Sequence, residues 1–312
     1  MKRVRASVKP GMENRKVNLI VMLVVLVACS TLTFVVARSH GAQTRRSKDA
    51  PSTTPTTRAT SRTTATSPFG AAATQNATLR NDLTWTFGGK QQHGWYLYDL
   101  LITKTLDTEH DPETSDFAAA MAKWQKRAGL GTNGILDENA LMRMISQWQS
   151  DRLKTRDVAD PSQLITAPPT DFFDPSRAPE LRLVERNTYA AYKKMLAAAI
   201  ADPVLKLAHT SGEDLAPKEQ YFKIVSAFRS RDYQDELRRK SPNSGTAGLA
   251  VNSPHFTGRA LDLYVGGDPV DTRDANRAIQ VNTPAYRWLV RNAERFGFRP
   301  YFYEPWHWEY VK

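Results

Sequence analysis

Cysteine is almost absent from this sequence of 312 residues, in which Cys29 stands alone. A single cysteine can form no disulfide within the chain, so its folded parts must be stabilised by packing or by a bound metal. Because Cys29 lies in an apolar run, thiolate metal sites and cysteine nucleophiles are excluded from the rest of the chain.

An excess of basic charge is also missing from most of the chain, although the formal net charge is +11. Residues 1–80 contain 13 of the 43 lysines and arginines and 2 of the 32 acidic residues, which leaves 30 of each sign in residues 81–312. Domains that bind nucleic acid carry a basic surface. The neutral balance after residue 80 therefore argues against nucleic acid as a partner.

The N-terminal region combines a basic tail, residues 1–16, with an apolar run, residues 17–37. A helix of roughly 20 residues spans about 30 Å, the thickness of the hydrocarbon core of a bilayer. Positive charge before the run favours a cytoplasmic N-terminus. We therefore expect a single-pass anchor in the cell membrane, with the rest of the chain on the periplasmic or cell-wall side.

A second interpretation of the apolar run is a lipid anchor. Residues 26–29, Leu-Val-Ala-Cys, resemble a bacterial lipobox, in which the cysteine (here Cys29) is lipidated. The apolar residues 32–37 argue against it, because mature lipoproteins usually begin with polar residues. A cleaved signal peptide is disfavoured because the apolar character continues past any cleavage site. Either anchor leaves the remainder outside the cytoplasm.

Residues 38–80 are rich in Ser, Thr, Ala and Pro, and their only aromatic side chain is Phe69. Such a segment buries too little apolar area to offset the entropy of ordering, so it is predicted to be a disordered linker. Residues 81–150 have a different pattern, with apolar and aromatic residues at helical spacing. They are predicted to form a small, mainly helical domain.

Within residues 81–150, a helix carrying Trp124 and Gln125 leads through a turn at Asn133 and Gly134 to a second helix after Asp137. This arrangement resembles the peptidoglycan-binding domain found beside many cell-wall hydrolases. The alternative is a helical domain whose aromatic side chains only form its core.

Residues 151–180 contain five prolines and are predicted to be an interdomain linker. Residues 181–312 mix helical and strand patterns without a regular βαβ repeat. A helix is expected over 181–201, strands over 222–228, 261–265 and 298–303, and a further helix over 284–296. This pattern predicts an α+β fold, in which helices flank a small antiparallel sheet.

Two segments near the C-terminus combine histidine with carboxylates. His255 and Asp262 are seven residues apart with Gly258 between them, and Glu304 precedes His307 by three residues. Two imidazoles and one carboxylate form a common ligand set for catalytic zinc, which keeps a fourth position for water. Glu304 could then accept the proton of that water. The sequence lacks the His-Glu-x-x-His helix of the common zinc proteases.

Three motifs in this region carry a family resemblance. They are Ser-x-His-x-x-Gly-x-Ala-x-Asp at 253–262, Glu-Pro-Trp-His at 304–307, and Ser-Ala-Phe-Arg-Ser at 226–230 followed by Gln234. Together they resemble the zinc D-alanyl-D-alanine carboxypeptidases of the VanY type. These belong to the LAS group of metallopeptidases, and the resemblance covers roughly residues 180–312. Phe228 replaces the tyrosine that is usual in the third motif.

The resemblance implies that Zn²⁺ is bound by His255, Asp262 and His307, and that Glu304 is the general base. It also implies that Arg229 stabilises the anionic tetrahedral intermediate, although a structural ion pair is the alternative for this residue. Ser253 and Gln234 would help to define the substrate pocket.

The function implied is removal of the terminal D-alanine from peptidoglycan stem peptides. An endopeptidase or an L,D-carboxypeptidase of the same fold is an alternative, because no motif reports the shape of the pocket. A wall-binding protein that holds zinc without hydrolysis is the alternative from another class. Intact Glu304 and Arg229 argue against it, because a binding module needs neither.

Overall fold

The computed structural model describes residues 68–210, 212, 214–242 and 249–312, all of which fall in one compact unit, Thr63–Lys312. The predicted basic tail, the anchor at 17–37 and most of the predicted linker at 38–80 lie outside the described residues. Among the described residues, no helix has the length and apolar character needed to cross a membrane. The anchor and the location of the protein therefore stay predictions.

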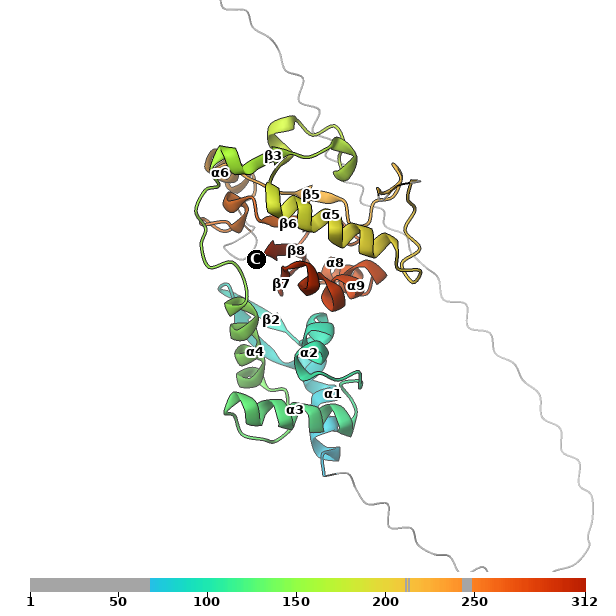
Figure 1. The fold of residues 1–312 in the computed structure, drawn as a ribbon. Coiled ribbons are helices and arrows are strands. Elements are labelled where there is room, and N and C mark those ends of the chain that lie inside the picture. Colours follow the sequence, from blue (N-terminus) through green and yellow to red (C-terminus); the bar gives the residue numbers. More distant parts are fainter. Residues whose placement is uncertain (1–67, 211, 213, 243–248) are drawn as a thin grey trace, which may run out of the picture. The chain divides into compact units, whose positions relative to one another are not determined.

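The first part of the described chain is mainly helical (Figure 1). One hairpin, in which the two strands pair antiparallel, interrupts the helices. The elements are α1 (Gly70–Asp82), β1 (Thr84–Phe87), β2 (Lys90–His93), η1 (Tyr96–Tyr98), α2 (Asp99–Leu106), α3 (Ser115–Ala128) and α4 (Glu138–Ser150).

Helix α1 begins inside the segment that the sequence assigned to the disordered linker. A polar side chain, Asn76, fixes it: the Asn76 amide donates to the carbonyl of Gly134 (2.9 Å), and its oxygen accepts from the N–H of Leu136 (2.8 Å). Asn76 is fully buried in these contacts. Apolar periodicity could not reveal this helix, because what anchors it is a hydrogen-bonded amide.

The residues that carried the likeness to a peptidoglycan-binding domain contact one another. The side-chain oxygen of Gln125 accepts from the N–H of Gly134 (2.8 Å), and its amide donates to Asn133 Oδ1 (2.7 Å). Asp137 caps α4 by accepting from the N–H of Ala140 (2.8 Å). These contacts give the motif a structural role in joining α3 to α4.

The segment predicted to be a linker, residues 151–180, has packed structure of its own. Its strand β3 (Leu164–Thr166) pairs antiparallel with β4 (Leu183–Glu185), and Ala167 and Phe172 are fully buried. Three short 3₁₀ turns, each starting with proline, complete it: η2 (Pro161–Gln163), η3 (Pro169–Asp171) and η4 (Pro179–Leu181). The prolines begin short turns in this segment, but the segment packs into the core and is not a separate linker.

The C-terminal part is built on a four-stranded sheet with the order β5-β6-β8-β7, in which all neighbours are antiparallel. The α+β prediction is thus confirmed for this part. Its elements are α5 (Arg186–Ile200), β5 (Ile224–Ser226), α6 (Arg231–Lys240), η6 (Pro254–Thr257), β6 (Ala260–Leu263), α8 (Asp274–Val281), α9 (Pro284–Asn292), η7 (Ala293–Phe296), β7 (Phe298–Tyr301) and β8 (Glu304–Tyr310).

Local chemistry accounts for the ends of the expected helix at 284–296. Thr283 caps α9 by accepting from the N–H of Tyr286 (3.2 Å), and Pro284 occupies the first helical position, where no N–H is needed. The last turn tightens into η7 before Gly297. Helix α8 had no counterpart among the sequence expectations.

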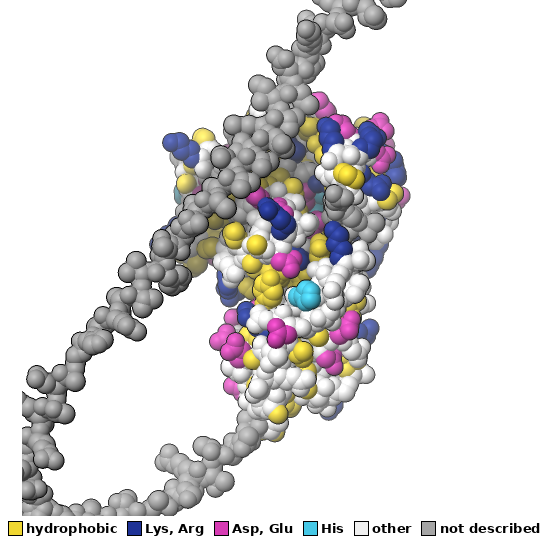
Figure 2. Space-filling view, turned by 180° about the vertical axis from the view of Figure 1, so that it is seen from behind, with side chains coloured by type: hydrophobic (Ala, Val, Ile, Leu, Met, Phe, Trp, Pro, Cys, Tyr) yellow, Lys and Arg dark blue, Asp and Glu magenta, His cyan; other side chains and the backbone are white. Residues whose placement is uncertain are grey.

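Aromatic side chains join the helical part to the sheet. Phe302 lies 4.7 Å from Phe87, 5.4 Å from Tyr98 and 6.1 Å from Trp148, measured between ring centroids. Arg277 of α8 also donates to the hydroxyl of Tyr98 (3.1 Å). The two parts therefore share one hydrophobic core. On the face seen in Figure 2, acidic and basic side chains are intermixed, in line with the neutral balance after residue 80.

Gly258 should be among the residues that tolerate substitution least. It ends η6 at φ +65°, and a Cβ there would lie 2.8 Å from the side chain of Leu164 and 3.0 Å from the backbone nitrogen of Glu185. Gly129 ends α3 at φ +74° with nothing within 4 Å of such a Cβ. We expect Gly129→Ala to cost about 1 kcal/mol of unfolding free energy and Gly258→Ala about 2–4 kcal/mol in urea denaturation. Equal costs would contradict the close packing described.

Candidate metal centre

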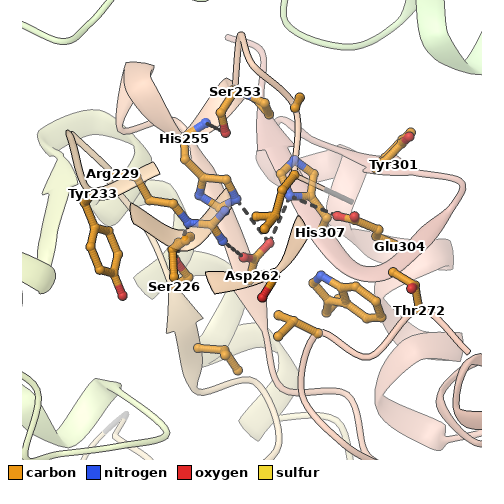
Figure 3. A pocket seen from close by; sticks show the side chains of 18 of the residues that line it. Ser226, Arg229, Tyr233, Ser253, His255, Asp262, Thr272, Tyr301, Glu304 and His307 are labelled. Atoms are coloured by element: carbon orange, nitrogen blue, oxygen red, sulfur yellow. Dashed lines mark hydrogen bonds and ion pairs between the residues drawn. The ribbon is translucent and has the colours of Figure 1, made fainter. Parts of the chain in front are cut away.

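The candidate site is built on a row of side chains across three strands. Asp262 of β6 pairs with His307 of β8 on one side and with Ser226 of β5 on the other. Residues directly opposite each other in an antiparallel sheet point to the same face. Register alone therefore brings a carboxylate and an imidazole together on one face of the sheet, as Figure 3 shows.

His255 reaches the same point from the short turn η6. Ser253 caps this turn by accepting from the N–H of His255 (3.3 Å), and Gly258 closes it in the left-handed conformation. The chain then enters β6, which carries Asp262. The turn at Gly258 thus brings His255 back towards Asp262.

In each histidine, one ring nitrogen faces Asp262 and the other is hydrogen-bonded to a different residue. Nδ1 of His255 lies 2.6 Å from the carbonyl oxygen of Ala227, which leaves Nε2 at 3.3 Å from Asp262 Oδ1. In His307 the nitrogens are reversed, with Nε2 at 3.2 Å from Glu309 Oε1 and Nδ1 at 2.9 Å from Asp262 Oδ1. The partners of the outer nitrogens fix the orientation of both rings.

This donor set fits a metal ion. The three ligand atoms lie within 4.8 Å of one another, and all three residues are buried. Donor atoms around a tetrahedral ion with bonds of about 2.0 Å lie roughly 3.3 Å apart. The separations of 2.9 and 3.3 Å from Asp262 are close to that value. The three residues thus form a candidate metal site with three protein ligands.

Glu304 joins this face because strand β8 is irregular. Residues three apart on a regular strand point to opposite faces, but the register between β7 and β8 shifts between Pro300 and Tyr301. Tyr301 pairs with Glu304, whereas Pro300 already pairs with Trp308. Consequently Glu304 Oε2 lies 3.9 Å from Nδ1 of His307.

Burial and the neighbouring charges together set the protonation states of His255 and Asp262. Burial lowers the pKa of His255 to about 4, with the charge of Arg229 acting in the same direction. Burial tends to raise the pKa of Asp262, but His255 and Arg229 outweigh it and hold that pKa well below its ordinary value. At neutral pH these two residues are therefore a neutral imidazole and a carboxylate, the forms that bind metal.

His307 and Glu304 have raised pKa values in the metal-free protein. Burial tends to lower the pKa of His307, but hydrogen bonds to Asp262 and Glu309 outweigh it and raise the pKa to about 9. Burial raises the pKa of Glu304 to about 8, although the charge of His307 opposes this. A metal that binds His307 must displace its proton.

Arg229, Ser253 and Gln234 lie near the metal ligands, in different positions. Arg229 Nη2 lies 2.5 Å from Asp262 Oδ2, and its Nε donates to Ser226 (2.9 Å), so the structure contains the ion pair that the sequence left open. Ser253 lines the cavity. Gln234 is buried behind Arg229, accepts from its Nη1 (3.4 Å), and is not among the described residues that line the cavity.

The cavity beside the ligands has a volume of about 420 Å³. It includes four arginines, Arg152, Arg156, Arg177 and Arg229. The sequence pointed only to Arg229, because the other three lie in the segment assigned to a linker. No motif marked them, and only a concentration of arginine between residues 152 and 182 could have drawn attention to this segment. Tyr233, Thr272 and Tyr301 also line the cavity and were not expected.

A buried His-Asp-His set with an adjacent glutamate, on an α+β scaffold, is the arrangement of a hydrolytic metal site. One comparison with known proteins supports a carboxypeptidase domain. Residues 182–312 match the family model VanY, described as D-alanyl-D-alanine carboxypeptidase. This part of the chain is therefore a VanY-type domain, and the resemblance inferred from the three motifs is confirmed.

A solved structure is also similar, titled "Structure of the LdcB LD-carboxypeptidase reveals the molecular basis of peptidoglycan recognition". The identity is 23%, the TM-score is 0.34, and the match covers 50% of this chain and 71% of that chain. A search of curated proteins found no match.

The raised pKa of His307 predicts how the metal-free protein responds to pH. The folded state keeps the His307 proton up to about pH 9, whereas an ordinary histidine loses it near 6.5. Its stabilising effect is therefore complete below about pH 6.5 and is lost as the pH rises through 9, a change on the order of 3 kcal/mol. We expect the difference in unfolding free energy between the wild type and His307→Gln, measured in chelator, to shrink over that interval. A difference independent of pH would refute the assigned hydrogen bonds.

Proposed function

We propose that this protein is a zinc-dependent carboxypeptidase that removes the terminal D-alanine from peptidoglycan stem peptides. The observation that carries the proposal is the convergence of His255, Asp262 and His307 beside Glu304, in a cavity lined by arginines. The match of residues 182–312 to the VanY family supports the reaction and the substrate class.

Zinc suits the site because two imidazoles and one carboxylate are a usual ligand set for its catalytic form. When bound, the ion would lower the pKa of a coordinated water to about 7 and polarise the scissile carbonyl. The chain holds the neutral Nε2 of His255 and the charged carboxylate of Asp262 ready for it. Nδ1 of His307 becomes available once its proton has left.

Glu304 is the group best placed to move protons. Its carboxylate is buried next to the metal ligands, and its pKa of about 8 in the metal-free protein lies near neutral pH. A group whose pKa is close to the working pH can accept a proton from the attacking water and return it to the leaving amine. Positive charge at the metal ligands favours its ionised form, in which it acts as the base.

Arg229 supports the site in two ways. Its Nη2 neutralises the second oxygen of Asp262, which keeps that residue ionised and fixed in place. The guanidinium also lines the cavity, and within the described part of the chain its Nη1 makes one long contact, 3.4 Å to Gln234. That nitrogen is the donor available for the oxygen that becomes negative during peptide cleavage.

The cavity charge favours a substrate with a free carboxylate. Among the described residues, four arginines and two acidic residues, Asp262 and Glu304, line the cavity, and Glu309 pairs with two of the arginines from behind it. Among the described residues, Arg156 is the least engaged of the four arginines: its buried Nη1 has no hydrogen bond there, and its ion pair with Glu309 is long at 3.6 Å. We assign Arg156 to the terminal carboxylate of the stem peptide, because arginine binds carboxylates through a pair of donors.

The rest of the chain would deliver this site to the cell wall. We propose that residues 81–150 contact peptidoglycan and that the predicted anchor at 17–37 holds the protein at the outer side of the membrane. Ser253 contributes a hydroxyl to the cavity, whereas Gln234 lies beside Arg229 and is not among the described residues that line the cavity.

Substitution of the proposed base is the first test. Glu304→Gln removes the proton acceptor while keeping the size of the side chain, so kcat/KM for alanine release from a stem pentapeptide should fall roughly 10²–10⁴-fold. Chelator should abolish release by the wild type, and added zinc should restore it. Mass spectrometry of the products and zinc content of each variant are the measurements.

The exposed Glu180 supplies the matched control, because Glu180→Gln should leave the rate unchanged. Alanine release that survives Glu304→Gln would reject Glu304 as the base. Three substrates separate the related reactions: release from pentapeptide supports the D,D-carboxypeptidase. Release only from tetrapeptide would indicate L,D-specificity, and cleavage only of cross-linked dimers would indicate an endopeptidase.

Arg156→Gln tests the proposed carboxylate contact. For a pentapeptide with a free carboxylate, KM should rise about tenfold or more, because a charged hydrogen bond contributes roughly 1.5–3 kcal/mol. For the same peptide ending in a carboxamide, the variant and the wild type should differ little. An equal loss for both substrates would show that Arg156 does not bind the carboxylate.

A further inference from the structure

One buried carboxylate lies behind the candidate metal centre. Glu309 follows His307 by two residues on β8, so both side chains point to the same face of the sheet. Its side chain has no exposed surface. A carboxylate in such a position needs charged or hydrogen-bonding partners, because an unpaired buried charge is strongly unfavourable.

The partners of Glu309 come from two distant parts of the chain. Its Oε1 lies 3.2 Å from Nε2 of His307, the nitrogen that faces away from the metal position. The same oxygen accepts from Nη2 (2.5 Å) and Nε (3.2 Å) of Arg152, and Oε2 accepts from the N–H of Leu153 (2.9 Å). Arg152 and His307 thus meet at a single oxygen atom.

Arg152 is itself held from several sides. Its Nη1 donates to the side chain of Gln149 in the last turn of α4 (2.7 Å). Its guanidinium lies over the ring of Tyr301, with 3.9 Å between Cζ and the ring centroid. These contacts fix the guanidinium where it can hold Glu309, and they link the end of α4 to the sheet that carries the metal ligands.

We propose that Arg152 is a positioning residue of the metal centre, which orients His307 through Glu309. The inference rests on the proposed function in one respect, namely that a metal binds at His307. It goes beyond that function because Arg152 lies outside residues 182–312, the part that matches the VanY family. In this chain, residues 151–180, which follow the helical part, supply a residue that supports the metal centre.

The physical reason lies in the two nitrogens of the imidazole. Metal binding at Nδ1 requires the proton to reside on Nε2 and the ring to keep one orientation. A carboxylate that accepts from Nε2 imposes both conditions. Arg152 keeps that carboxylate charged and directed at the ring, whereas without Arg152 the remaining partners of Glu309 would be the Leu153 N–H, His307 and the distant Arg156.

Zinc affinity measured on the full-length chain tests this proposal, by competition with a chromogenic chelator at fixed pH. Substitution of a residue that is hydrogen-bonded to a metal-bound histidine typically weakens metal affinity 10–100-fold. We expect Glu309→Gln to weaken zinc binding within that range and Arg152→Gln to weaken it about tenfold. Arg152→Lys should recover part of the loss. The double variant should be no weaker than Glu309→Gln alone, because Arg152 acts through Glu309.

Arg80 provides a matched control. Its Nη2 and Nε both donate to one oxygen of Asp99, at 2.5 and 2.9 Å, which repeats the Arg152–Glu309 geometry far from the site. Arg80→Gln should leave zinc affinity unchanged. Thermal unfolding of each metal-free variant separates a general loss of stability from a specific loss of metal affinity.

The outcomes distinguish this inference from the proposed function. A wild type that binds zinc, together with Arg152→Gln of equal affinity, would overturn the role of Arg152 alone. A wild type that binds no zinc would overturn both. Weakened zinc binding in Arg152→Gln and Glu309→Gln, in a protein that releases no alanine, would support the positioning role and reject the proposed reaction.

Discussion

The structure of the site depends on one constraint, the burial of the Asp262 carboxylate in the middle of the sheet. Asp262 is 1% exposed and is surrounded by His255, His307 and Arg229. Register places it opposite His307, whereas the turn at Gly258 is what brings His255 to the same oxygen. A charge this deeply buried persists only with such partners, so the fold and the donor set require each other.

The alternation of positive and negative side chains around Asp262 continues behind the candidate metal centre. His307 lies between Asp262 and Glu309, and Glu309 lies between His307 and Arg152. Each carboxylate is thus bounded by cations or by N–H donors, and hydrogen bonds between charged groups are stronger than those between neutral ones. The row runs from Arg229, just after β5, to Arg152, just after α4. It adds ion pairs to the hydrophobic core that the helical part and the sheet share around Phe302.

Much of the candidate site could be predicted from the sequence. Motif spacing pointed to His255, Asp262, His307 and Glu304, whose side chains the structure brings together, because short motifs keep their geometry when they lie on a strand or a tight turn. Features of the fold that depend on contacts between distant residues could not be predicted from the sequence. Helix α1 depends on the amide of Asn76, and the packing of residues 151–180 depends on pairing between β3 and β4. The arginines of that segment reach the cavity only through tertiary folding, so no local pattern could reveal them.

Three particular atoms are proposed to form one metal position: Nε2 of His255, a carboxylate oxygen of Asp262 and Nδ1 of His307. Crystals of the zinc-loaded protein, with anomalous diffraction recorded on either side of the zinc absorption edge, measure this directly. We expect a single strong peak bounded by these three atoms, about 2.0–2.2 Å from each. A peak beside Nε2 of His307 and Glu309, or no peak among the three residues, would contradict it.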